Sequence, residues 1–506
     1  MYRFVVIRNL RSGHTTTHAH LIENGCHAFT ITHGKKGIPV TYPTDIRDVE
    51  TIDRGTRVRA LLASGIGSTI EWYDFILYGT MAAIVFGPLF FPARDPSIAL
   101  MLSFASFALA FAMRPIGGII FSHIGDRIGR KKTLVMTLSL MGGSTLAMGL
   151  LPDYNAIGVW APILLTVLRV IQGVALGGEW GGGVLLAVEY APKKYRGLFG
   201  AVPQVGTMLG LALGSLAASE ASAIFSKEDF LRVGWRIPFI LSFVLVIIAF
   251  WIRSTVDETP SFKKVLANES ANKVPLLETV KFHWRAVLMT IGAKFIETSV
   301  FYIFAVFSIS YTIGLGFKRT DTLNAVLVAS LLSAPMVLFS AWISDRIGRK
   351  KIYIIGALAS MVFVLPFFWL VHQGSVVLLY LAVVVGFAVI YPMVGAVMGP
   401  LFAENFPPEV RYTGISLGYQ LGTALVGGPL PLIATALLVA FHGSYVPIAL
   451  FVGLCGIVSL IAISFAQEGR GQDLDARRTV PPLGVGPALD AAERQPRLTN
   501  SISDNG

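Results

Sequence analysis

Ionisable side chains stand inside long apolar runs of this sequence, where they could do chemistry shielded from water. Glu71 and Asp74 lie three residues apart, and Tyr78 continues the same helical face. Charged groups in such surroundings are costly and are functional candidates by default. Burial favours the protonated form of a carboxylate, so Glu71 or Asp74 is predicted to take up and release a proton. The alternative is that one of them makes a structural hydrogen bond or ion pair and never titrates.

A buried cation is the strongest candidate for binding an acid. Arg169 lies several residues inside the apolar run ILLTVLRVIQG, with Gln172 one turn further on. A guanidinium presents a planar fork of donors that matches a carboxylate. Arg169 is therefore predicted to anchor an acidic substrate. It could instead be an internal counter-ion to Glu71 or Asp74, and both roles hold in turn if the substrate displaces the carboxylate.

Other polar residues extend this candidate site. Lys294 and Glu297 are again three residues apart in a later apolar run, and Glu297 is predicted as a further proton-coupling residue unless the pair neutralises itself. Glu179 stands among glycines that favour tight helix packing, and it could bind substrate or act in a gate. Besides Arg169, the residues predicted to contact substrate are Tyr78, Gln172, Glu179, Lys294, Tyr302 and Gln420. The aromatic residues among them could equally serve packing.

The composition identifies the surroundings of these residues. Of 506 residues, 54% are hydrophobic and only 14% are charged, whereas soluble domains carry about a quarter charged residues. This is the composition of an integral membrane protein. The net charge of +11 lies mainly in short loops, which indicates membrane orientation rather than nucleic-acid binding. Cys26 and Cys455 are far apart in the chain, so no disulfide framework or CxxC metal site is expected.

Twelve apolar runs are long enough to cross a membrane as helices. A basic stretch, 254–284, separates six runs from six, and polar segments at 1–57 and 467–506 are expected to be disordered. The histidines of the first segment fit no compact zinc template, so no metal site is predicted there. The runs are 60–90, 97–121, 133–151, 158–187, 198–224, 236–253, 286–315, 322–343, 352–371, 375–402, 412–440 and 445–466.

Two features repeat between the halves. The loop GDRIGRKK at 125–132 recurs as SDRIGRKK at 344–351, and Glu189 and Arg196 recur as Glu404 and Arg411 at nearly the same offset. The chain is therefore predicted to be a duplicated six-helix unit, with bundles at 58–253 and 285–466. Alternate loops are rich in Lys and Arg, with exceptions near 227–236 and 318–319, which places both termini in the cytoplasm.

The repeated loops suggest a gate between the bundles. An Asp there can bond the N-terminus of a neighbouring helix while an Arg pairs with a carboxylate of the other bundle. If the cations only obeyed the orientation rule, the repeated Asp would have no explanation. The predicted gating residues are Asp126, Arg127, Arg130, Glu189, Arg196, Asp345, Arg346, Arg349, Glu404 and Arg411.

The repeated loop resembles the signature of the major facilitator superfamily, although Ser344 stands where the first loop has Gly125. Further motifs resemble the metabolite:proton symporter family and, within it, the bacterial shikimate transporters. The resemblance covers about residues 58–466, and the motifs are EWYDFILYG (71–79), RPIGG (114–118), RVIQGVALGGEWGGG (169–183), WRIPF (235–239) and DETPSF (257–262).

This resemblance implies an all-α membrane protein of twelve helices in two bundles, a monomer in the lipid of the inner membrane. It implies proton symport of a small organic acid, with shikimate as the first candidate. The same motifs would serve 2-oxoglutarate, citrate-like or aromatic carboxylates, or a zwitterionic osmolyte, because a fold does not specify the ligand. A channel is disfavoured by the repeated gate loops. An enzyme is disfavoured because the spans contain no HExxH or P-loop motif and no paired metal ligands, and no cofactor is expected.

Overall fold

The computed structural model describes residues 29–31, 38–40, 54–128, 130–177, 180–255, 275–407 and 410–471. Residues 1–56 and 57–506 form two separate units. In the first unit, β1 (Phe29–Ile31) pairs antiparallel with β2 (Ile38–Val40), although this segment was expected to have no regular structure. The short runs FTI and IPV supply the β-branched residues that favour strands. Residues 54–57, predicted as the end of the polar arm, already belong to the helix that starts at Arg54, and the rest of the arm lies outside the described part of the chain.

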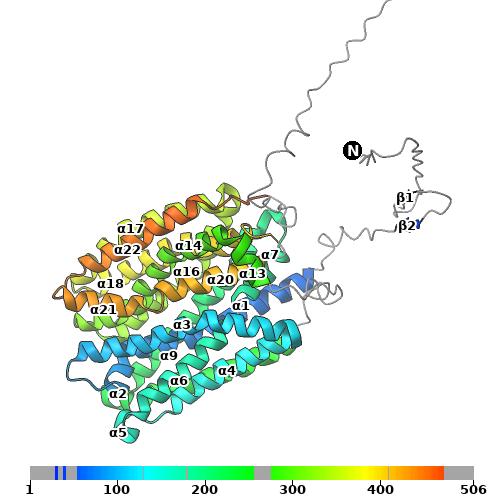
Figure 1. The fold of residues 1–506 in the computed structure, drawn as a ribbon. Helices are drawn as coiled ribbons and strands as arrows, with labels where there is room; N and C mark the ends of the chain where they lie inside the picture. Colours follow the sequence, from blue (N-terminus) through cyan, green and yellow to red (C-terminus); the bar gives the residue numbers. More distant parts are fainter. Residues whose placement is uncertain are drawn as a thin grey trace, which may run out of the picture. The chain divides into compact units, whose positions relative to one another are not determined.

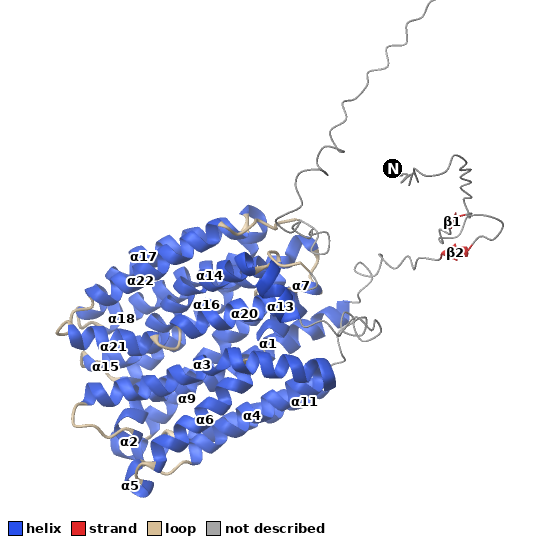
Figure 2. Ribbon diagram, in the orientation of Figure 1, coloured by secondary structure: helices blue, strands red, loops and turns tan. Residues whose placement is uncertain are grey.

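The second unit is helical, and its helices run side by side (Figures 1 and 2). The first six apolar runs form α1 (Arg54–Met81), η1 (Ala82–Phe86), α2 (Gly87–Phe90), α3 (Pro96–Ile128), α4 (Arg130–Leu150), α5 (Tyr154–Ile157), α6 (Trp160–Leu176), α7 (Trp180–Glu189), η2 (Lys193–Tyr195), α8 (Arg196–Gly200), α9 (Val202–Ile224), α10 (Lys227–Asp229), η3 (Phe230–Gly234) and α11 (Arg236–Thr255).

The last six runs follow α13 (Pro275–Phe282), a short helix within the predicted linker. They form α14 (Trp284–Tyr302), η5 (Ile303–Phe307), α15 (Ser308–Gly314), α16 (Arg319–Ile347), α17 (Arg349–His372), α18 (Val376–Val383), η6 (Val384–Ile390), α19 (Tyr391–Ala403), α20 (Arg411–Val426), α21 (Leu430–Ala440) and α22 (Val446–Ser464).

Every predicted apolar run is thus helical in the described residues. Ten helices there are long and apolar enough to cross a membrane, and α10 and η3 together with α11 add an eleventh, bent by 41°. The run in α4 is described as a shorter apolar helix, Met136–Leu150. Large apolar side chains remain exposed along the helices, for example Phe243 and Ile247 of α11, as expected of a surface that lipid covers.

Glycines let α3 and α6 approach closely. A Cβ atom on Gly117 would lie 1.9 Å from the carbonyl oxygen of Val174, and one on Gly177 would lie 2.0 Å from that of Arg114. Real side chains do not tolerate such distances, so any larger residue must push the helices apart. This contact fixes α6, which carries Arg169, against α3, which carries Arg114.

The two bundles meet through α9 against α16 and through α3 against α20. We call the end of the unit that carries the repeated loops, where α3 and α16 end and α4 and α17 begin, the basic-loop end. The other end is called the opposite end.

Candidate functional site

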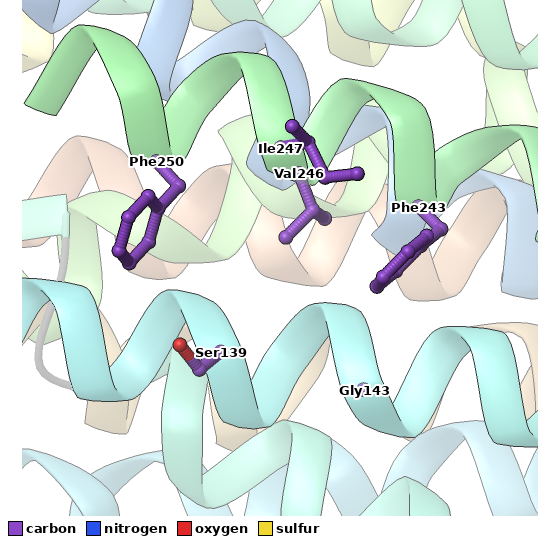
Figure 3. A pocket seen from close by; sticks show the side chains of 6 residues that line it. All are labelled: Ser139, Gly143, Phe243, Val246, Ile247 and Phe250. Carbon is purple, nitrogen blue, oxygen red and sulfur yellow. The ribbon is translucent and has the colours of Figure 1, made fainter.

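A surface groove between two helices has no charged residue in its lining. It lies between α4 and α11, has a volume of about 230 Å³, and Figure 3 shows its apolar lining. Its lining residues are Ser139, Gly143, Phe243, Val246, Ile247 and Phe250. With no charged residue in that lining, this groove is not the site that the sequence predicted.

A polar chain in the first bundle joins the predicted acid to the predicted anion anchor. Asp74 is fully buried in α1, and its Oδ2 accepts a 3.1 Å hydrogen bond from Thr145 of α4. Thr145 in turn accepts a 2.8 Å bond from Nε2 of Gln172, whose Oε1 accepts one from Nη1 of Arg169. The carboxylate and the guanidinium are therefore linked through two neutral side chains. Glu71 is also buried, one turn before Asp74.

The guanidinium of Arg169 has N–H groups that make no hydrogen bond in the described residues. Its guanidinium lies 4.1 Å from the ring centre of Tyr78 and 4.5 Å from that of Phe75, so aromatic faces hold its plane. Within the described residues, its Nε and Nη2 are buried and have no hydrogen-bond partner. These two nitrogens lie along one edge of the guanidinium, the edge that can grip a carboxylate with two parallel bonds. Tyr78 itself is bonded to Ser106 at 2.7 Å.

Arg114 was not among the predicted site residues. It is 2% exposed in α3, and its guanidinium lies 4.3 Å from the ring centre of Phe75, the same ring that Arg169 contacts, and 4.7 Å from that of Phe111. The sequence did carry a signal for it, because the RPIGG motif puts a cation inside an apolar run. The ring of Phe75 therefore lies against two guanidinium groups.

The second bundle contributes an ion pair. Lys294 and Glu297 of α14 are bonded to each other, as the alternative reading of the sequence expected, and Thr298 donates a 3.0 Å bond to the same oxygen of Glu297. The other oxygen accepts a 2.9 Å bond from the hydroxyl of Tyr391, in α19. That hydroxyl accepts a 2.7 Å bond from Nε2 of Gln204, in α9 of the first bundle. No sequence signal indicated Thr145, Tyr391 or Gln204, because polar residues of these types are common in helices.

Aromatic side chains connect the bundles across the centre. The Lys294 ammonium lies 4.0 Å from the ring centre of Tyr419, which stacks on Trp180 with centres 3.5 Å apart. Gln420 donates a 3.3 Å bond to the carbonyl oxygen of Gly177 in the first bundle. Tyr302 makes an edge contact with Phe107 at 5.8 Å, and its buried hydroxyl has no partner within the described residues.

A small cavity lies where these residues of the two bundles meet. It leaves about 10 Å³ for the centre of a water molecule, roughly the room for one water. It brings together three predicted residues, Lys294, Glu297 and Tyr302, with aromatic and hydroxyl neighbours. The lining residues are Trp72, Lys294, Glu297, Thr298, Phe301, Tyr302, Tyr419 and Thr423. Asp74, Arg169 and Gln172 are outside this lining, so the structure holds the predicted site residues in two groups.

Contacts between the bundles close the basic-loop end. Asp345 accepts bonds of 2.8 and 3.0 Å from the backbone N–H groups of Gly197 and Leu198, at the start of α8 in the other bundle. Its carboxylate also pairs with Arg349 at 2.7 Å. Glu404 lies 3.5 Å from Arg349 and 3.6 Å from Arg196 of the first bundle. The contacts predicted for Asp345 and Glu404 are present, and their role in gating stays a prediction.

Other predicted gating residues lie elsewhere. Arg346 is exposed and stacks on Trp342 of its own helix, 3.6 Å from the ring centre, because its position faces away from the other bundle. Arg411 donates from Nε to the carbonyl oxygen of Phe406 at 3.2 Å. The described part of the chain does not include Glu179 or the side chains of Asp126, Arg127, Arg130 and Glu189.

The tail contributes a contact that the sequence did not predict. Glu468, placed by the sequence in a disordered tail, accepts bonds of 3.1 and 3.0 Å from the backbone N–H groups of Arg349 and Lys350. Free N–H groups at a helix start attract a carboxylate, which explains the order there.

The opposite end is closed as well. Ser219 of α9 donates a 2.6 Å bond to Asn324 of α16, and Arg319 lies 4.5 Å from the ring centre of Phe230. The described residues therefore include contacts between the bundles at both ends of the helices.

Comparisons with known proteins agree on one group. The sequence profile of the Major Facilitator Superfamily matches residues 75–431. The chain is 39% identical over 427 residues to the shikimate transporter of Escherichia coli (strain K12), covering 84% of this chain and 98% of that protein. It is 31% identical over 432 residues to the proline/betaine transporter of the same strain, covering 83% and 85%. A solved D-xylose-proton symporter has a TM-score of 0.65 over 82% of this chain and 99% of its own, at 19% identity, which establishes the fold.

Proposed function

Because this chain belongs to the major facilitator superfamily, and is therefore a secondary transporter in the membrane rather than an enzyme, we propose that it imports a small organic acid with a proton. The substrate we favour is a ring acid similar to shikimate. Transport proceeds by alternating access: each end of the molecule opens in turn while the other stays closed.

The observation that carries this proposal is the free edge of Arg169. Two buried N–H groups without partners are costly, and a substrate carboxylate that accepts from both would satisfy them. The aromatic rings of Phe75 and Tyr78 hold the guanidinium in place beforehand, so little ordering is left to do on binding. The similarity to a shikimate transporter supports an acid with ring hydroxyl groups.

Asp74 is the proposed site of the coupling proton. It is fully buried, and Thr145 donates a hydrogen bond to its Oδ2. The chain through Thr145 and Gln172 connects it to Arg169, so charge added at the guanidinium by an anion alters the field at the carboxylate. A substrate anion would thereby favour proton uptake by Asp74. Glu71 and Glu297 remain further candidates.

We place the protein in the inner membrane as a monomer, with the basic-loop end and both termini in the cytoplasm. The basis is the concentration of Lys and Arg in alternate short loops. In this orientation, the contacts of Asp345 and Glu404 form the cytoplasmic gate.

A zwitterionic osmolyte is the second candidate, because a relative is named a proline/betaine transporter and aromatic rings line the cavity. Such rings can bind a quaternary ammonium group. Here, however, the ammonium of Lys294 already lies over the ring of Tyr419 and is paired with the carboxylate of Glu297. An osmolyte would have to displace this internal cation, so the acid is favoured.

The test is uptake of labelled shikimate by proteoliposomes that contain the purified protein, with and without an inward proton gradient. We expect saturable uptake that the gradient stimulates and that unlabelled organic acids inhibit. Competition by betaine rather than by acids would favour the second candidate. Uptake that neither saturates nor responds to the gradient would contradict symport.

A further inference from the structure

Tyr391 occupies a position that links a buried charge to the contact between the bundles. Its hydroxyl donates to Glu297 at 2.9 Å within the second bundle and accepts from Gln204 of the first bundle at 2.7 Å. Gln204 is the third residue of α9, which starts at the basic-loop end. The hydroxyl is thus the junction between Glu297 and a contact that must break when that end opens.

The ring of Tyr391 is held independently of its hydroxyl. It stacks on Phe387 with centres 5.1 Å apart and meets the edge of Phe301 at 5.4 Å. One turn further along, Gly395 leaves room for it: a Cβ there would lie 2.9 Å from the ring and 3.0 Å from the hydroxyl oxygen. The packing therefore aims the hydroxyl at Glu297 and Gln204, and removing the oxygen alone leaves this packing in place.

We propose that Tyr391 is a positioning residue that reports the protonation of Glu297 to the basic-loop end. When Glu297 is ionised, the Tyr391 O–H is fixed by a charge-assisted bond, and its oxygen lone pairs face Gln204. When Glu297 takes a proton, this bond becomes neutral and weaker, so the hydroxyl can turn away from Gln204. Protonation thereby favours opening at the basic-loop end. This inference rests on the proposed function only in taking the proton as the coupled ion.

In the described residues, the hydroxyl of Tyr391 connects Glu297 to the first bundle by hydrogen bonds. Lys294 and Thr298, on the same helix, bond its other oxygen. Titratable and charged groups from five helices face the ion pair of Lys294 and Glu297. They are Tyr302 from α14, Tyr353 from α17, Tyr391 from α19, Tyr419 from α20 and Arg114 from α3.

The experiment measures opening directly. Spin labels on cysteines that replace Lys194 and Lys351, both exposed and one in each bundle, report the separation of the bundles at the basic-loop end. The background carries Cys26→Ser, and the buried Cys455 is kept. The separation is measured in proteoliposomes in mildly alkaline and mildly acidic buffer. We expect acid to increase the open population of the unmodified background.

Tyr391→Phe keeps the ring and removes the junction. We expect it to raise the ratio of open to closed molecules about tenfold in alkaline buffer and to flatten the response to acid, since the hydrogen bond from Gln204 of the other bundle is lost. Gln204→Ala should do the same without touching Glu297. Glu297→Gln should match the acid state and add little to Tyr391→Phe. Gly395→Ala, which displaces the hydroxyl rather than deleting it, should act in the same direction.

Tyr353→Phe is the matched control. It removes a buried hydroxyl that also bonds α14, at the carbonyl oxygen of Ala293, but stays within the second bundle. The distances between the spin labels in this variant should change with acid as they do in the unmodified background. If Tyr391→Phe behaves like Tyr353→Phe, the inference is wrong. Uptake of labelled shikimate by the unmodified protein is measured in the same vesicles. If shikimate is not the substrate, this uptake is absent. The measured distances then still test the role of Tyr391, because they do not depend on the substrate.

Discussion

Replacing Arg169 tests the candidate site most directly. The guanidinium offers Nε and Nη2 to a substrate carboxylate, and each charge-assisted bond is worth about 1.5–3 kcal/mol. Loss of both costs about 3–6 kcal/mol, and each 1.4 kcal/mol is about tenfold in affinity. Arg169→Ala should therefore weaken shikimate binding at least about a hundredfold. Arg169→Lys keeps the cation but loses the fork, so about tenfold is expected.

The assay is the KM for labelled shikimate in proteoliposomes, with fold integrity followed by size-exclusion profile and Tm. Arg236→Lys is the control, because this arginine also stacks on an aromatic ring, Trp235, and bonds the carbonyl oxygens of Gly149 and Leu151, away from the centre. It should change stability without changing KM. A folded Arg169→Ala protein with a KM within about twofold of the unmodified protein would refute the role of the free edge.

Three further predictions concern coupling, the gate and packing. Asp74→Asn can still accept a hydrogen bond from Thr145 but cannot take up a proton. Exchange of shikimate should therefore persist, while stimulation of uptake by the proton gradient disappears. If the stimulation is retained, Asp74 is not the residue that binds the coupled proton. Asp345→Ala removes two bonds to backbone N–H groups of the other bundle and should raise the open population at the basic-loop end several-fold in the spin-label measurement, whereas an unchanged distance would exclude it from the gate. Gly117→Ala puts a methyl group 1.9 Å from the carbonyl oxygen of Val174, so the Tm of the purified protein should fall clearly, and an unchanged Tm would show that the helices can separate freely there.

Sequence reasoning about the site succeeded where the residue type carried the signal. A charge within an apolar run is costly wherever the helix packs, so Asp74, Arg169, Lys294 and Glu297 could be selected without a structure. Thr145 and Tyr391 could not, because a hydroxyl in a helix is as often bonded to its own backbone. Arg114 carries the same signal as Arg169, a cation within an apolar run.

The sequence by itself determined the membrane environment, the helical runs and the duplicated plan, and the comparisons confirm the fold and the family that its motifs indicated. These features depend on hydropathy, charge and local repeats, which are read along the chain. Only the tertiary structure decided that Asp74 reaches Arg169 through two neutral residues, that Arg346 stays outside the gate, and that Glu297 is tied to the first bundle by Tyr391. Such pairings join residues up to 187 positions apart, and they depend on how helices rotate and pack, which periodicity in one helix does not specify.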